Sequence, residues 1–361
     1  MKVAIVKQVL DTFGPWSSVR WEETSPEGLF RIWPSRALHW EMTTLLGADW
    51  YIVPQQVNTD YTYDSVLKQR GSAEIVRRYT QKVVAPDDIP YDSYDLVITN
   101  DPILDFPSSS RTLFAYFVVE HWDRRYRTSL HRPMRNADLF LAHMMDAPES
   151  LGRLPAAISF PYIRDPKSTR ALFSATEREE AVWADWRTLS FLSATNNGNS
   201  AEVIKAAARR LEEALHLPVV FRSFSMGLYH GEDPPLWGDA AEFLRELGRQ
   251  KYYLCLGRGS GAGQGLADAA SLGCICFGER DKPYHRLLCH PEVLCGDLQE
   301  LPRRVRRVHA SRDFQEEIRA WQEEKLRQHF IEEPLALLGA ALERKRKRAT
   351  NMVSQAAGNR C

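Results

Sequence analysis

Five glycines at alternate positions are the feature of this sequence with the clearest chemical meaning. They follow an apolar run at 252–256 and precede a small-residue stretch at 265–272, and they are Gly257, Gly259, Gly261, Gly263 and Gly265. Without a Cβ atom, a glycine backbone lets amide groups approach a ligand closely. The first turn of a following helix adds unpaired N–H groups and the positive end of its dipole. The pattern is typical of a phosphate or diphosphate site; the alternative is a surface loop without a ligand.

The loop does not fit the dinucleotide-binding pattern G-x-G-x-x-G. The sixth residue of that pattern should be glycine, but in the three possible registers it is Ala262, Gln264 or Leu266. One residue supports a dinucleotide nevertheless, because Glu279 follows the next apolar run, where a ribose-binding acid would lie. An NAD(P)-dependent enzyme therefore stays open as an alternative.

The segment from Gln264 to Phe277 resembles a motif of the GT-B glycosyltransferases of the family-4-like type, which transfer a sugar from a nucleoside diphosphate sugar. In that motif a glycine loop opens a helix that carries an acid, and a glycine turn and an apolar strand follow. The resemblance implies that Asp268 binds the ribose. The family's first acidic position is occupied by Ser260, which lacks the carboxylate. The other residues expected at the nucleotide are Gly259, Gly261, Gly263 and Gln264.

The diphosphate leaving group must be neutralised by amides, basic side chains or a metal. The family usually supplies an arginine and a lysine after the first strand of the second domain. Here that segment, taken as Phe191–Ser200, holds no basic residue. We expect Arg258, in the glycine loop, and Arg222, beyond another strand, to replace them; the alternative is a surface arginine paired with a carboxylate.

Candidate catalytic residues come from the first half of the chain. The run Tyr116–His121 resembles the family's strand that ends in a histidine facing the donor sugar. The resemblance implies that His121 hydrogen-bonds the sugar or the leaving oxygen, and that Glu120 orients it or acts as a base. Asp11 follows the first strand, where an inverting enzyme would place its base. We expect retention of configuration, as in most members; the alternative for each residue is a structural role.

Short β-branched or aromatic runs alternate with longer helical stretches, which favours parallel sheets with crossover helices. The expected strands of the first half are 3–6, 50–53, 96–99, 113–119, 139–142 and 157–160. After a turn-rich exit at 161–166 and a polar, helical stretch through 177–186, a second series follows. Its expected strands are 188–193, 218–221, 252–256 and 274–277, and its helices are 201–215, 239–247, 265–272, 313–329 and 334–347.

The predicted fold class is α/β, with two Rossmann-like domains whose parallel sheets face each other across a cleft. The domains are an acceptor-side domain at 1–165 and a nucleotide-sugar domain at 166–312. Helices at 313–348 are expected to return to the first domain, and a loose tail follows at 349–361. Ligands of such folds bind beyond the carboxyl ends of the strands.

The composition excludes several classes of partner and cofactor. The chain has 361 residues, with 47 Lys and Arg against 47 Asp and Glu, so no overall field attracts nucleic acid. The longest apolar run, Leu113–Val119, is far shorter than the roughly 18 residues of a membrane helix.

His285, Cys289 and His290 do not complete a tetrahedral metal site, and we expect no metal and no cofactor beyond the donor. The basic runs 303–307 and 344–348 leave peripheral contact with anionic lipid open, against solvated helix faces.

We therefore expect a cytoplasmic glycosyltransferase that acts on a glycan, lipid-linked or small-molecule acceptor. Two alternatives remain from the sequence. One is another nucleotide- or NAD(P)-dependent α/β enzyme. The other is a noncatalytic relative that binds nucleotide sugars, because the first acid and the basic pair of the family are missing.

Overall fold

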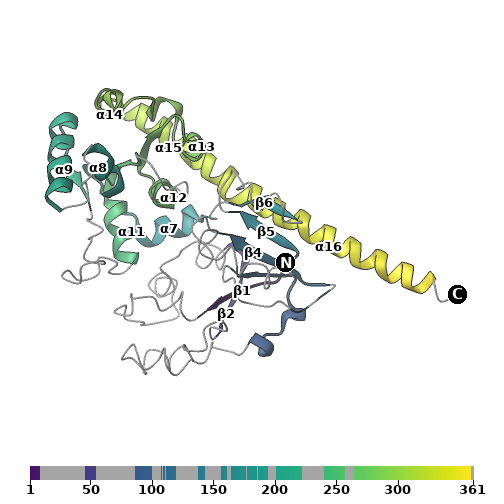
Figure 1. Cartoon of the computed structure of the whole chain (residues 1–361). Coiled ribbons are helices and arrows are strands. Elements are labelled where there is room, and N and C mark those ends of the chain that lie inside the picture. Colours follow the sequence, from purple (N-terminus) through teal and green to yellow (C-terminus); the bar gives the residue numbers. More distant parts are fainter. Residues whose placement is uncertain are drawn as a thin grey trace, which may run out of the picture. The chain divides into compact units, whose positions relative to one another are not determined.

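The structure is a computed structural model of the full chain. It describes residues 1–8, 45–53, 86–99, 107, 109, 111–118, 137–142, 156–160, 164–175, 177–184, 186–193, 201–221, 240–256 and 264–358. The chain divides into two compact units (Figure 1). Unit 1 consists of Met1–Ile163 and Glu332–Cys361, and unit 2 is Arg164–Ile331.

Unit 1 contains a six-stranded sheet in the order β2-β1-β3-β4-β5-β6, with every pairing parallel. The strands are β1 (Val3–Gln8), β2 (Asp49–Val53), β3 (Leu96–Thr99), β4 (Leu113–Val118), β5 (Leu139–Ala142) and β6 (Ala157–Ser159). Two short 3-10 helices, Pro86–Asp88 and Tyr91–Ser93, precede β3. Strands in a parallel sheet are covered on both faces, which explains why β1 begins with four fully buried apolar residues.

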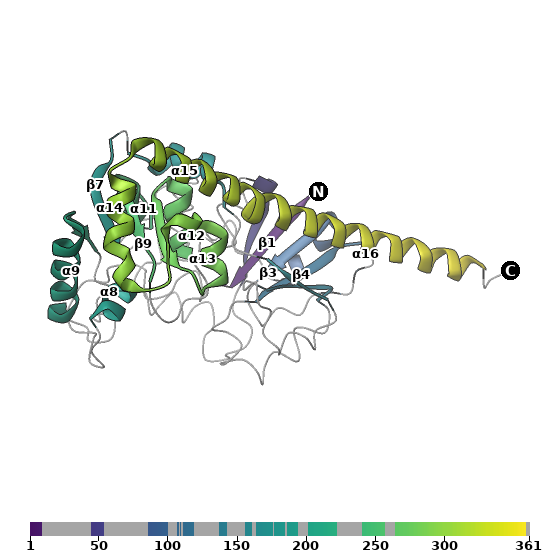
Figure 2. The same ribbon diagram turned by 90° about the horizontal axis from the view of Figure 1, so that it is seen from above.

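The helix α16 (Glu333–Gly358) belongs to unit 1 and lies along its sheet (Figure 2). It contacts β4, and Lys345 Nζ lies 2.5 Å from Asp138 Oδ1, next to the start of β5. The return of a C-terminal helix to the first half is confirmed. The prediction of a loose tail from Ala349 is wrong, because the helix continues to Gly358 through a segment without proline.

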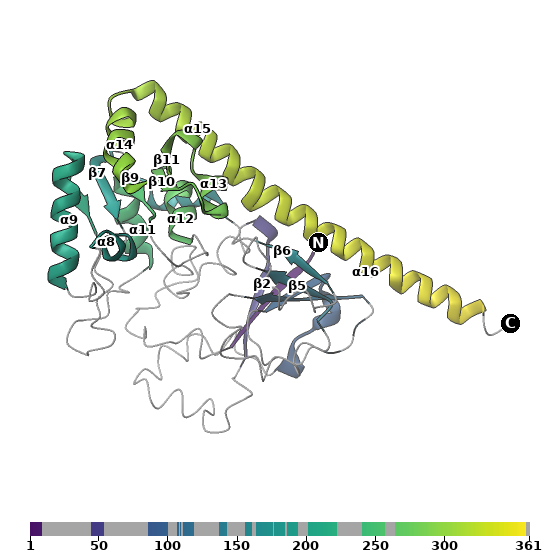
Figure 3. The ribbon, with the colours of Figure 1, turned by 45° about the horizontal axis from the view of Figure 1, so that its top comes forward.

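Unit 2 contains a second parallel sheet, of five strands, in the order β11-β10-β9-β7-β8 (Figure 3). The strands are β7 (Glu179–Ala184), β8 (Val219–Val220), β9 (Gln250–Leu254), β10 (Ile275–Glu279) and β11 (Leu294–Cys295). The α-helices are α7 (Pro166–Phe173), α8 (Trp186–Leu192), α9 (Ala201–Leu215), α11 (Ala240–Arg249), α12 (Gln264–Leu272), α13 (Pro283–Leu288), α14 (Leu301–His309) and α15 (Arg312–Arg327). The 3-10 helices Pro291–Val293 and Leu298–Glu300 also belong to the unit, and the π-helix Gln328–Glu332 ends at the first residue of the C-terminal segment of unit 1. The helix α15, expected to return to the first half, belongs to this unit.

The start of unit 2 differs from the sequence prediction in both type and position. The helical stretch through 177–186 is instead the strand β7, and the strand expected at 188–193 is instead the helix α8. The strand β7 lies between β9 and β8, and all four residues from Ala181 to Ala184 are buried. Burial between two neighbouring strands outweighs the helical preference of Glu and Ala, which is a weak local term.

A side chain from α15 completes the backbone hydrogen bonding of β10. The strand β11 pairs with β10 only at Gly278 and Glu279, which leaves the first part of β10 without a strand on that side. There the side chain of Gln322 accepts the Cys276 N–H at 3.1 Å and donates to the Cys274 carbonyl at 3.0 Å. The buried side-chain amide thus makes the hydrogen bonds that a neighbouring strand would otherwise make, and these bonds hold α15 on the sheet.

Candidate functional site

The helix α12 begins at Gln264, directly after the glycine loop, and its C-terminal end is neutralised by arginines. The Ser271 carbonyl accepts a hydrogen bond from Arg170 Nε at 2.8 Å. The guanidinium of Arg178 donates to the carbonyls of Leu272 and Gly273. Because basic groups compensate the negative end of the dipole, the field of α12 is strongest at its N-terminal end, where an anion is favoured.

The last glycine of the series is explained by packing. A Cβ atom at Gly265 would lie 2.5 Å from the hydroxyl oxygen of Tyr253, a buried residue of β9. The first turn of α12 can therefore approach β9 closely only because this position is glycine. Gly265 positions the helix, while the preceding glycines remain the candidates for ligand contact.

A threonine of α8 holds the chain where it enters the glycine loop. The Thr188 hydroxyl is fully buried and accepts the Leu256 N–H at 3.0 Å. Its oxygen also lies 3.2 Å from the carbonyl oxygens of both Leu254 and Leu256, either of which can accept its proton. Thr188 thereby holds Leu254 and Leu256, directly before the loop, and no motif in the sequence predicts this role.

A histidine holds the end of the neighbouring strand β10. Nδ1 of His285 accepts the Glu279 N–H at 2.8 Å, so the ring proton of the neutral tautomer resides on Nε2, 3.5 Å from Cys255 Sγ. Burial, with a smaller contribution from Lys282, lowers the pKa of His285 to about 4. The ring is therefore neutral near pH 7 and acts as a structural acceptor at the carboxyl edge of the sheet.

The described part of the chain shows no metal site around this histidine. No group of three or more His, Cys, Asp or Glu side chains in the residues that can be placed is arranged to hold a metal ion. Cys289 is fully buried, and burial raises the pKa of its thiol well above the ordinary range. The carboxylate of Glu279, the residue that would bind the ribose in a dinucleotide site, forms an ion pair with Lys282 at 2.9 Å.

Asp268 lies in the second turn of α12 and is buried, with 5% of its side chain exposed. Arg164 forms an ion pair with it: Arg164 Nε lies 3.0 Å from Asp268 Oδ1, and the arginine side chain is fully buried. Asp268 follows Gln264 by four residues, so both lie on the same face of the helix, one turn apart. Its predicted role at the ribose stays a prediction, now with a buried arginine at its side.

Most of the predicted site residues lie outside the part of the chain that the structure describes. These are Asp11, Glu120, His121, Arg222, Arg258, Gly259, Ser260, Gly261 and Gly263. Their roles remain predictions from the sequence.

Moving the first strand of unit 2 to β7 also moves the segment that follows it. The prediction looked for basic residues at 191–200, but the chain leaves β7 at Ala184 and continues into α8 at Trp186. Arg187 lies in the first turn of α8, at the carboxyl edge of the sheet. The sequence prediction did not include this arginine, because it placed the first strand of the unit after it, at 188–193.

The two basic runs of the sequence are partly neutralised by carboxylates within their own units. The pairs are Arg304–Glu300, Arg307–Glu292, Lys345–Asp138 and Arg346–Asp95. Among the residues that the structure places, no helix is long and apolar enough to cross a membrane.

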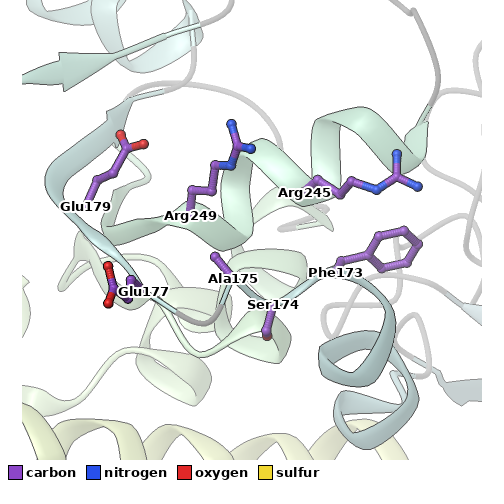
Figure 4. A pocket seen from close by; sticks show the side chains of 7 residues that line it. All are labelled: Phe173, Ser174, Ala175, Glu177, Glu179, Arg245 and Arg249. Carbon is purple, nitrogen blue, oxygen red and sulfur yellow. The ribbon is translucent and has the colours of Figure 1, made fainter.

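A hollow of about 510 Å³ in unit 2 lies at the amino ends of two strands of the sheet (Figure 4). Glu179 begins β7 and Arg249 ends α11 immediately before β9, so both mark the amino ends of the strands. The lining residues are Phe173, Ser174, Ala175, Glu177, Glu179, Arg245 and Arg249. Because ligands of open α/β sheets bind at the carboxyl edge, this hollow is not the predicted nucleotide site.

Solved structures of known proteins share the fold of this chain. No family model and no curated protein match the sequence. An α-glucosyltransferase, solved in complex with UDP and a 13-mer DNA, is 10% identical with a TM-score of 0.52, covering 95% of this chain and 100% of that chain. Sucrose-phosphate synthase from Thermosynechococcus elongatus is 12% identical with a TM-score of 0.50, covering 97% of this chain and 100% of that chain. The likeness spans both units and confirms the GT-B fold expected from the glycine-loop motif.

Proposed function

We propose that this protein is a glycosyltransferase that moves a sugar from a nucleoside diphosphate sugar to a glycan, lipid-linked or small-molecule acceptor. One observation carries the proposal: α12 begins where the glycine loop ends, at the carboxyl edge of a parallel sheet, in a chain with the GT-B fold over nearly its whole length. We take uridine diphosphate as the first nucleotide to test, because the similar α-glucosyltransferase was solved with UDP.

In this proposal the loop amides and the N-terminal end of α12 bind the diphosphate, and Asp268 accepts hydrogen bonds from the ribose. Arg258, Arg222 and Arg187 are the candidates for neutralising the charge that develops on the leaving diphosphate. The compensated C-terminal end of α12 supports this role, since the helix then presents its positive end to the loop. No metal and no further cofactor enter the proposal.

In this proposal, residues of the first half of the chain bind the donor sugar. His121 is the proposed contact to the donor sugar, with Glu120 orienting it, and the proposed outcome is retention of configuration. NMR of the product with a UDP-sugar donor tests this assignment through the anomeric signal. An inverted product would contradict retention, and Asp11 or Glu120 would then be the proposed general base that deprotonates the acceptor.

A second candidate function is a noncatalytic protein that binds nucleotide sugars. Ser260 favours it, since the family's first acidic position has no carboxylate in this chain. Measuring nucleotide binding and donor consumption on one sample separates the two functions. A transferase binds UDP and consumes the UDP-sugar when a suitable acceptor is present. A noncatalytic relative binds UDP and leaves the donor intact with every acceptor in a panel of glycans and lipid-linked sugars.

A further inference from the structure

Arg164 is a fully buried arginine at the point where the chain enters unit 2. Its Nε lies 3.0 Å from Asp268 Oδ1, and the two side chains are 0% and 5% exposed. A buried charge is expensive unless an opposite charge compensates it. The two residues are 104 positions apart in the sequence, so the pair is a tertiary contact that fixes α12 against the beginning of the unit.

Two hydrogen bonds anchor the main chain at Arg164 and Asp165 within unit 2. The Arg164 N–H donates to the Phe330 carbonyl at 3.3 Å, in the π-helix 328–332. The ring of Phe330 packs edge-on against Tyr284 of α13, with centroids 5.5 Å apart. The carbonyl of Asp165 accepts the Thr169 N–H at 3.0 Å, at the start of α7. The guanidinium therefore reaches Asp268 from a fixed base.

The helix that carries Asp268 is held as firmly as the arginine. α12 packs against α7, α11, α13 and α15. The contact is an ion pair and not a hydrogen bond, and with both backbones fixed the attraction between the two charges favours carboxylate orientations that keep Oδ1 near Nε. A carboxylate fixed in this way presents its hydrogen-bond acceptors in a constant direction, which a ligand hydroxyl can use without ordering the side chain first.

We propose that Arg164 is a positioning residue that orients Asp268 for the nucleotide ribose. The inference rests on the proposed function, because it takes the ribose as the ligand of Asp268. Arg164 itself does not touch the nucleotide. A hydrogen bond to a charged group contributes roughly a 10- to 100-fold gain in affinity, and that gain depends on the direction of the acceptor. The predicted effect of losing Arg164 is thus confined to the contribution of the ribose hydroxyls.

Calorimetric titration with UDP and with 2′,3′-dideoxy-UDP tests the proposal, since the ratio of the two affinities reports the ribose hydroxyls alone. The proteins are the wild type, Arg164→Met, Arg164→Lys and Asp268→Asn, each as the full chain. Arg327→Met is the matched control, because it removes an exposed arginine of unit 2 that pairs with Glu324. We expect the wild type and the control to prefer UDP by roughly 10- to 100-fold. We expect a smaller ratio than in the wild type both in Asp268→Asn, whose uncharged amide oxygen is a weaker acceptor, and in Arg164→Met, with unchanged affinity for the dideoxy compound.

Lysine keeps the charge but not the planar fork, so Arg164→Lys should give an intermediate ratio, and it decides the question if Arg164→Met does not fold. A wild-type ratio in the folded Arg164 variants, together with its loss in Asp268→Asn, would overturn the inference and leave the proposed function standing. Equal loss of affinity for both compounds would show a merely structural role for Arg164 and overturn it too. A wild type that binds neither compound would refute the nucleotide site itself, and the inference with it.

Discussion

Gly265→Ala should change the sign of its effect on stability when Tyr253 is replaced by phenylalanine. The new Cβ atom would lie 2.5 Å from the Tyr253 hydroxyl oxygen, closer than a side-chain carbon normally lies to any neighbour. Overpacking of this kind costs about 1–3 kcal/mol, whereas alanine is favoured over glycine in a helix by about 0.5–1 kcal/mol. We expect a net loss of about 1–2 kcal/mol in the free energy of unfolding for Gly265→Ala alone.

Tyr253→Phe removes the clashing oxygen. The next atom of the ring, Cζ, lies 3.5 Å from the position that the alanine Cβ atom would take, an ordinary van der Waals contact. In this background Gly265→Ala should stabilise the protein by about 0.5–1 kcal/mol. A double-mutant cycle by urea denaturation of the full chain then gives a coupling energy of about 2 kcal/mol. A coupling energy near zero would refute the close packing of the α12 start on β9.

Three further predictions concern the two units. Gly248→Ala should destabilise unit 2 by about 1–3 kcal/mol, because the new Cβ atom would lie 2.4 Å from the backbone oxygen of Phe173. Gly339→Ala, with open space around it, should stabilise α16 by about 0.5–1 kcal/mol in the same denaturation assay. Thr188→Val should weaken UDP binding by about tenfold through a less ordered loop entrance, whereas Thr188→Ser, which keeps the hydroxyl, should bind as the wild type does in calorimetry. His285 has a pKa of about 4 in the folded chain and near 6.5 in the unfolded chain, so between these pH values it binds a proton mainly when the chain unfolds. Its contribution to the free energy of unfolding is therefore fully present above pH 6.5 and falls by about 2 kcal/mol at pH 5. Denaturation curves at pH 7 and pH 5 should show this loss in the wild type and not in His285→Asn.

Strands flanked by clear turn residues were predictable from the sequence. The predicted bounds 96–99 and 139–142 agree with β3 and β5. A short apolar run between polar turns is typical of a strand buried on both faces of a parallel sheet, so the turns mark where the strand begins and ends. The segment 177–193 was not predictable from local pattern. Glu179 and Glu180 begin a strand whose remaining residues are buried, and only the neighbouring strands β8 and β9 make that arrangement favourable.

The candidate site was predictable only where its signal is local in the chain. The glycine loop and the start of α12 lie within one continuous segment, so their order along the sequence is itself the signal. Thr188, His285 and Arg164 act through contacts with other elements. Thr188 and Arg164 reach partners 68 and 104 residues away, and no periodicity or motif marks them in the sequence. Their positions follow from tertiary packing alone.

The central claim is that a nucleoside diphosphate binds where the glycine loop meets α12. Calorimetric titration of UDP into the full chain tests it most directly, with the double variant Gly261→Val/Gly263→Val and with Gly339→Ala as the control glycine substitution far along the chain. We expect saturable binding with one UDP per chain, which is lost in the double variant and retained in the control, while both variants keep the wild-type circular dichroism spectrum. Unchanged UDP affinity in a folded double variant would contradict the claim.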